Sequence, residues 1–138
     1  MNTGTDASIH FKKVHKPLGF RTKPTNKETI MKLLTKEIKA KLISNDKKGR
    51  DKPIEQEYSV CKFFDPTGSW TWYAYSIDDD GYLFGYVAGS EPEYGLFHIK
   101  ELEEVRLPFG LGIERDAYYT PELFKDITNR HLNIYAGG

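Results

Sequence analysis

From residue 58 to residue 99 the hydrophobic pattern repeats every second residue, and three turn sequences interrupt it. Apolar and aromatic side chains at this period are typical of half-buried β-strands. The turns are residues 65–68 (DPTG), 78–81 (DDDG) and 89–92 (GSEP), in which Gly supplies positive φ, Pro fixes φ and Asp can bond its own backbone. Turns this short join antiparallel neighbours. The pattern therefore predicts a four-stranded meander, with strands over residues 58–64, 70–77, 82–88 and 94–99.

An amphipathic helix is predicted before the strands. Apolar residues recur at helical spacing from Met31 to Leu42 with lysines between them, which predicts a helix of about four to five turns that covers one face of the sheet. Its start stays open, because Thr25 begins a capping box and Thr35 is a second candidate for the cap. A polar loop over residues 44–56 is expected to follow.

Two shorter helices are predicted after the strands, one over residues 100–106 and one that starts at Thr120 and runs to about residue 130. Residues 117–119 are expected to form a fifth, edge strand, and residues 131–138 to fray. The predicted fold class is α+β. It has an antiparallel four- to five-stranded meander sheet, packed by an N-terminal amphipathic helix and shorter C-terminal helices.

Charge divides the chain, although its formal net charge is zero. Residues 1–52 carry 14 Lys and Arg against 5 Asp and Glu, a net +9, whereas residues 53–138 carry 6 against 15, a net −9. Such asymmetry is typical either of a solvated basic arm or of a surface made for a polyanion. Residues 1–24 hold few apolar side chains and are predicted to be a mobile basic arm. A single domain is expected over residues 25–130.

The basic N-terminal part supplies the candidates for nucleic-acid binding. Lysine and arginine side chains neutralise phosphates and release counterions, so such binding weakens steeply with salt. The second and third predicted strands carry no Lys or Arg, which makes the sheet itself a poor surface for phosphates. The candidate residues are Lys12, Lys13, Lys16, Arg21, Lys23, Lys36 and Lys39.

Aromatic side chains lie on both faces of the second predicted strand, where Trp70, Trp72 and Tyr73 are the binding candidates. One face can form the core. The other must be covered by a helix or stay exposed, and exposed aromatics on a sheet suit a protein–protein surface or the stacking of bases.

Three consecutive charged residues, Glu114, Arg115 and Asp116, lie between an apolar loop and a tyrosine-rich segment. In an extended chain Glu114 and Asp116 point to one side and Arg115 to the other. Two interpretations stay open. The carboxylates, together with Asp65, are candidates for acid–base chemistry or metal binding. Alternatively, Arg115 is a structural clamp bonded to backbone carbonyls or to Asp65; it is also a binding candidate.

The sequence lacks the residue patterns that several kinds of site require. The lone Cys61 can form no intrachain disulfide and is expected to be a small buried apolar residue. The aspartates at 78–80 lack the spacing of a calcium loop, the four histidines are scattered, and there is no phosphate-binding glycine loop or nucleophile elbow. We therefore predict no metal and no cofactor. Because no long apolar run and no signal-peptide pattern occur, we expect a cytoplasmic protein without a membrane partner.

Five motif blocks carry a resemblance to a known family: residues 62–73 (KFFDPTGSWTWY), 84–85 (FG), 93–95 (EYG), 99–103 (IKELE) and 110–116 (GLGIERD). In their order and spacing, over about residues 30–125, the chain resembles the domain-of-unknown-function family DUF2958. The resemblance implies a bacterial or phage origin, in genes common on plasmids, phages and integrative elements. It implies no reaction, cofactor or ligand. The chain departs from the family by its longer basic arm, residues 1–28, and by the sequence His-Ile-Lys at 98–100.

Three hypotheses for function follow. The first is a non-enzymatic binding module, encoded on a phage or mobile element, that contacts an unidentified protein of the host or the element. The second is a nucleic-acid-binding accessory protein that uses residues 12–52. The third is a small enzyme that uses Asp65, Glu114 and Asp116. The sequence favours the first and gives no decisive sign of an enzyme; we expect a monomer or a weak oligomer in the cytoplasm of a bacterial host.

Overall fold

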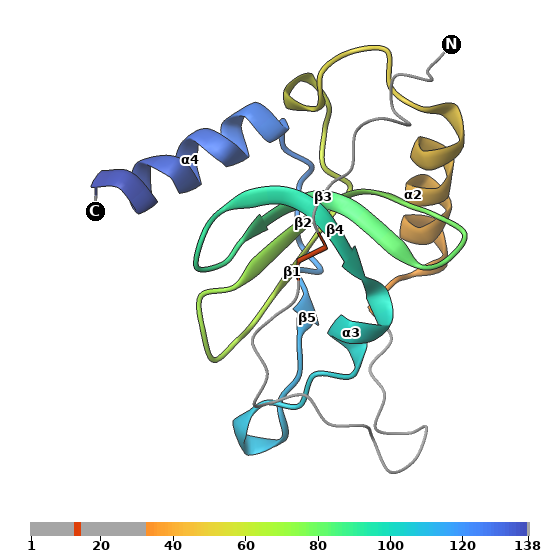
Figure 1. The fold of residues 1–138 in the computed structure, drawn as a ribbon. Coiled ribbons are helices and arrows are strands. Elements are labelled where there is room, and N and C mark those ends of the chain that lie inside the picture. The colour runs from red at the N-terminus through yellow and green to blue at the C-terminus, as the bar shows by residue number, and fades with distance from the viewer. Residues whose placement is uncertain (1–12, 15–32, 138) are drawn as a thin grey trace.

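The computed structural model describes residues 13–14 and 33–137 of the chain (Figure 1). Its strands are β1 (Cys61–Phe64), β2 (Thr71–Ile77), β3 (Tyr82–Ala88), β4 (Glu93–His98) and β5 (Glu114–Arg115). They form one antiparallel sheet in the order β4-β3-β2-β1-β5. The predicted α+β class and the meander of four strands are thereby confirmed.

The fifth strand lies elsewhere than the sequence predicts. The strand that pairs with β1 is β5, whereas residues 117–118 form a turn. The backbone N–H of Asp116 still donates to the carbonyl of Lys62 at 2.9 Å. The carboxylate of Asp116 then accepts from the backbone N–H of Tyr118 at 3.0 Å. This local bond turns the chain away from β1 and ends the pairing.

Helix α2 (Lys36–Lys48) covers one face of the sheet, which we call the first face. Of the two caps considered, Thr35 starts the helix, because its hydroxyl accepts from the N–H of Ile38 at 3.1 Å; Thr25 lies outside the described residues. The helix continues into the segment predicted as a loop. The buried Asn45 explains this, because its amide donates to the carbonyl of Tyr75 at 2.8 Å where β2 bulges.

Both faces of the sheet are covered. The first face packs α2 and α3 (Ile99–Glu103), and the opposite second face packs the 3-10 turn Ile54–Gln56 and helix α4 (Phe124–Gly137). In the described part of the chain, no helix is both long and apolar enough to cross a membrane. The buried apolar residues of the first face include Leu42, Phe63, Trp72, Leu83, Phe97 and Leu102; those of the second face are Ile54, Tyr73, Tyr75, Phe84, Tyr86, Phe124 and Ile127.

Helix α4 begins later and ends later than predicted. It starts at Phe124 instead of Thr120 and continues to Gly137, through residues expected to fray (Figure 1). The backbone explains the late start. The N–H of Ser59 donates to the carbonyl of Glu122 at 2.8 Å, and the N–H of Phe124 donates to the carbonyl of Glu57 at 3.0 Å. The segment before α4 is therefore held extended against residues 57–59.

Two residues of the predicted mobile arm have a defined place. The N–H of Val14 donates to the carbonyl of Leu96 in the edge strand β4 at 2.7 Å, and the Val14 side chain is buried in the first-face core. The ammonium of Lys13 lies 4.4 Å from the centre of the Tyr82 ring. The rest of residues 1–24 lies outside the described residues, so its mobility stays a prediction.

Candidate functional site

A cleft of about 530 Å³ opens on the second face of the sheet, and we call it the tyrosine cleft. Its walls come from β1, β2, the segment 116–122 and α4, which are far apart in the sequence. The cleft is shallow and open to solvent, unlike the enclosed pockets that surround small molecules. The lining residues are Lys62, Thr71, Tyr73, Asp116, Tyr118, Tyr119, Thr120, Glu122, Arg130 and His131.

Strand register explains how these residues come together. Lys62 pairs with Tyr73 across β1 and β2, Tyr73 with Tyr86 across β2 and β3, and Tyr86 with Tyr94 across β3 and β4. Directly opposed residues of antiparallel strands point to the same face, so the four side chains form one row. Asp116 extends this row beyond Lys62. Because α4 packs over the Tyr94 end, the Lys62 end opens into the cleft.

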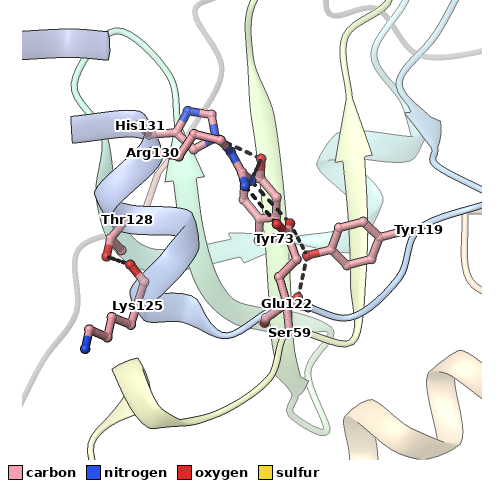
Figure 2. Close-up of polar contacts among 8 residues, drawn as sticks. All are labelled: Ser59, Tyr73, Tyr119, Glu122, Lys125, Thr128, Arg130 and His131. Carbon is pink, nitrogen blue, oxygen red and sulfur yellow. Dashed lines mark hydrogen bonds and ion pairs between the residues drawn. The ribbon is translucent and has the colours of Figure 1, made fainter. Parts of the chain in front are cut away.

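A hydrogen-bonded network connects α4 to the floor of the cleft (Figure 2). Arg130 donates to both carboxylate oxygens of Glu122, at 2.8 and 3.2 Å, and to the hydroxyl of Tyr73 at 3.3 Å. The same hydroxyl lies 2.8 Å from Nε2 of His131. Two consecutive residues of α4 therefore hold one phenol, and the Tyr73 side chain is only 2% exposed.

The network continues to the segment that precedes α4 (Figure 2). The hydroxyl of Tyr119 donates to the Glu122 carboxylate at 3.2 Å and lies 2.5 Å from Oγ of Ser59. Oγ of Ser59 also accepts from the backbone N–H of Glu122 at 3.2 Å. Glu122 is thus the centre of the network, and its position depends on donors from two different segments.

Burial and the neighbouring charges set the protonation state of each group in the network. Burial raises the pKa of Tyr73, so its phenol stays protonated at neutral pH. Burial, with Arg130 and Lys62 nearby, lowers the pKa of His131, which is therefore a neutral imidazole. The Tyr73 hydroxyl accepts from Arg130 and forms a second hydrogen bond with Nε2 of His131, whose donor is set by the imidazole tautomer. The bond from Arg130 lowers the pKa of Glu122 and keeps it ionised.

The side chains of Lys62 and Tyr118 line the cleft but are not members of the hydrogen-bonded network. The ammonium of Lys62 lies 5.9 Å from the centre of the Tyr73 ring, and among the described residues no ion pair joins it. Its charge helps to lower the pKa values of both Glu122 and His131. Tyr118, on the wall of the cleft, is 95% exposed.

The three carboxylates proposed for catalysis are not gathered in this cleft, because only Asp116 lines it. Asp65 is buried and accepts from the N–H and the hydroxyl of Thr67, both at 2.8 Å, within the turn between β1 and β2. Glu114 lies on β5. Arg115 donates through Nε to the carbonyl of Leu33 at 2.9 Å, which confirms the interpretation of Arg115 as a clamp on a backbone carbonyl.

The aromatic candidates separate by face. Trp72 is fully buried in the first-face core, because its side chain points toward the face that α2 covers, and it offers no surface to a partner. The half-buried Trp70 packs beside it, with ring centres 5.8 Å apart. Tyr73 points to the second face and reaches the cleft.

The nucleic-acid candidates lie apart from the cleft lining. Lys36 and Lys39 are exposed on α2, on the first face of the sheet, and Lys13 is exposed beside Tyr82. Lys12, Lys16, Arg21 and Lys23 lie outside the described residues. Among the residues that the structure describes, no group of three or more His, Cys, Asp or Glu side chains could hold a metal ion.

A family model described as "Protein of unknown function (DUF2958)" matches residues 33–129 of the 138-residue chain. The chain belongs to the DUF2958 family. The match confirms the family resemblance seen in the sequence, and it covers the sheet, α2 and the start of α4. Lys62, Thr71, Tyr73 and Asp116 lie within the DUF2958 motif blocks, whereas Arg130 and His131 follow the matched range directly. Comparison with curated proteins and with solved structures found no match.

Proposed function

We propose that this DUF2958 protein is a non-enzymatic protein-binding module and that the tyrosine cleft is its docking site. The observation that carries the proposal is the contrast between the floor and the wall of the cleft. The floor is a network whose members already bond one another, whereas Tyr118 on the wall is 95% exposed. Exposed tyrosines beside ordered polar groups are typical of the residues that dominate protein interfaces.

The chemistry of the floor supports binding over catalysis. A tyrosine nucleophile needs a lowered pKa or an adjacent base that removes its proton in the reaction. The neutral imidazole of His131 lies 2.8 Å from the Tyr73 hydroxyl. Burial nevertheless raises the pKa of Tyr73, and the residue is only 2% exposed, which leaves a substrate little access to this oxygen. The bonds of the network fix the floor before a partner arrives, which lowers the entropy cost of binding.

Charge supports a protein as the partner at this cleft. Residues 53–138, which supply all of the cleft residues, carry a net charge of −9. The cleft itself is lined by the two cations Lys62 and Arg130 and by the two carboxylates Asp116 and Glu122. A polyanion such as DNA or RNA would meet repulsion here, whereas a mixed surface is suited to a polar protein segment.

The test is affinity capture from a bacterial lysate with four full-length baits: the wild type, Tyr118→Ser, Tyr58→Ser and Phe109→Ser. Tyr58 is 59% exposed and Phe109 is 95% exposed, and both lie outside the lining of the cleft. They are therefore matched controls for the loss of an exposed aromatic ring. We expect one protein to be retained by the wild type and both control baits and to be reduced at least about tenfold by Tyr118→Ser, as for an interface hot spot.

Calorimetry with the purified partner should then give the same ranking of the four proteins. Capture that depends on Phe109 or Tyr58 instead of Tyr118 would refute the tyrosine cleft as the docking site. The absence of any protein that distinguishes wild type from Tyr118→Ser would refute the function. The setting that we propose, following the family resemblance, is the cytoplasm of a bacterium that carries a phage, plasmid or integrative element.

A second proposal is nucleic-acid contact through the basic N-terminal part and α2. It is favoured by the exposure of Lys36 and Lys39 on α2. Fluorescence anisotropy with DNA and RNA oligonucleotides tests it. The binding constant should fall steeply between low and physiological salt. The double variant Lys36→Gln, Lys39→Gln should reduce the slope of log K against log salt concentration by about two, one released ion for each lysine. Salt-independent or undetectable binding would contradict it.

A further inference from the structure

We infer that the tyrosine cleft recognises a single carboxylate on its partner, with Lys62 as the main contact and Arg130 and His131 beside it. The inference rests on the proposed function, because it names the group that the docking site takes. The carboxylate can belong to an Asp or Glu side chain or to the C-terminus of a chain, and the experiment below separates these sources.

Positive charge converges at one place in the cleft. Lys62 comes from β1 and Arg130 from α4; both line the cleft, and the charge of each helps to lower the pKa of His131 on the same lining. Arg130 is already bonded to Glu122, and its side chain is still partly exposed. No ion pair joins Lys62 in the described part of the chain. An anion in front of Lys62 would therefore gain a charge-assisted hydrogen bond without breaking an existing ion pair.

The two carboxylates of the cleft favour a ligand with one negative charge. Asp116 lies at the Lys62 end of the row, and Glu122 lies beside Arg130. A phosphate monoester, which carries nearly two charges at neutral pH, would meet both of these like charges. A carboxylate meets half of that repulsion and needs only the donors of Lys62, with the hydroxyls of Thr71 and Thr120 on the same lining.

The cleft also offers an apolar surface next to this charge. Tyr118 belongs to the same lining as Lys62, and its exposed ring can cover the carbon atoms that carry a carboxylate. A volume of about 530 Å³ has room for one side chain with its flanking backbone. This combination points to a carboxylate on a peptide and not to a free inorganic anion.

The test is an NMR titration of the full-length protein with paired probes. N-acetylphenylalanine and its amide test a chain end, and the N-methylamides of N-acetylglutamate and N-acetylglutamine test a side chain. We expect the His131 imidazole and Tyr118 ring signals to move and saturate with at least one acid, at a Kd on the order of millimolar, and not with its amide. Phenyl phosphate should bind more weakly than that acid.

Two lysine variants complete the experiment. Lys62→Met should weaken binding of the acid about tenfold or more, as expected for loss of one charge-assisted bond. Lys125→Met removes the same charge from an exposed position on α4 outside the cleft lining and should change nothing. Equal binding of acids and amides, an unaffected Lys62→Met protein, or tighter binding of phenyl phosphate would overturn the inference.

The capture experiment and the NMR titration can fail independently, so the docking function and the carboxylate recognition are tested separately. If no acid binds up to the solubility limit of the probes while Tyr118→Ser still abolishes capture of the partner, the carboxylate is wrong and the docking site stands. If the acids bind but capture does not depend on Tyr118, the cleft is an anion site and the proposed function is wrong.

Discussion

Two paired tyrosines allow the same atom to be removed from two neighbouring sites with opposite expected results. Tyr73 and Tyr86 lie directly opposite each other on β2 and β3, and their side chains are 2% and 3% exposed. The Tyr73 hydroxyl bonds both Arg130 and His131. The Tyr86 hydroxyl is buried and has no hydrogen-bond partner among the described residues. We therefore expect Tyr73→Phe to destabilise the fold and Tyr86→Phe to stabilise it.

The magnitudes follow from the partners. Tyr73→Phe removes one hydrogen bond to a charged group and one to a neutral imidazole, and since both partners are partly exposed, water can replace part of the loss. The expected destabilisation is about 1.5–2 kcal/mol. Tyr86→Phe removes a buried hydroxyl whose desolvation is not compensated, which should stabilise the protein by about 1 kcal/mol. The two variants should therefore differ by about 3 kcal/mol in free energy of unfolding, or by about 10 °C in Tm.

Urea unfolding followed by tryptophan fluorescence and by circular dichroism measures these differences, and calorimetry gives the Tm values. The urea m-value should stay constant, so that each change in midpoint reports stability. Equal destabilisation by both variants would show that the hydrogen bonds of Tyr73 contribute nothing beyond ring packing. A larger loss for Tyr86→Phe than for Tyr73→Phe would refute the assignment of the network itself.

Three further predictions concern the backbone, the pH dependence and the cysteine. A Cβ added at Gly85 would lie 1.8 Å from the carbonyl oxygen of Tyr73, so Gly85→Ala should destabilise the fold by about 3 kcal/mol or more in urea unfolding; a loss below about 1 kcal/mol would contradict the strand register. Because the bond from Arg130 lowers the pKa of Glu122 from 4.5, the native state binds fewer protons than the unfolded chain near that pH. The free energy of unfolding should therefore decrease as pH falls below about 4.5, and Glu122→Gln should make this decrease smaller. An unchanged pH dependence in the variant would contradict the ion pair. Burial raises the pKa of Cys61 to about 12, so a thiol reagent at pH 8 should label it only after unfolding, and rapid labelling of the native protein would show that β1 opens.

The strands were predictable where their pattern is local. Both ends of β3 match the prediction, β2 starts one residue later than predicted, and β4 starts and ends one residue earlier. The agreement is close because each of these strands is bounded by a turn whose residues enforce the reversal. β5 and the start of α4 were not predictable in this way. Both are fixed by backbone bonds to residues 57–64, which lie 50 to 67 positions earlier in the chain, and no local pattern reports such pairing.

The candidate site was predictable only in part, for the same reason. Alternation along β1 and β2 is sufficient to place Lys62 and Tyr73 on one face. The contact of Tyr73 with His131 joins residues 58 positions apart, and it exists only because α4 continues through residues that the sequence led us to expect would fray. The charged run at 114–116 attracted attention through its composition, but Arg115 turns to the carbonyl of Leu33 and only Asp116 reaches the cleft.

The contact of Val14 with β4 has a practical consequence for anyone who shortens this protein. β4 is an edge strand, and unpaired edges are templates for aggregation with other chains. A version that begins at the family match, residue 33, would free the Leu96 carbonyl and remove a valine from the core. Such a shortened protein should precipitate or self-associate more readily than the full chain, so poor behaviour after trimming should not be attributed to the domain itself.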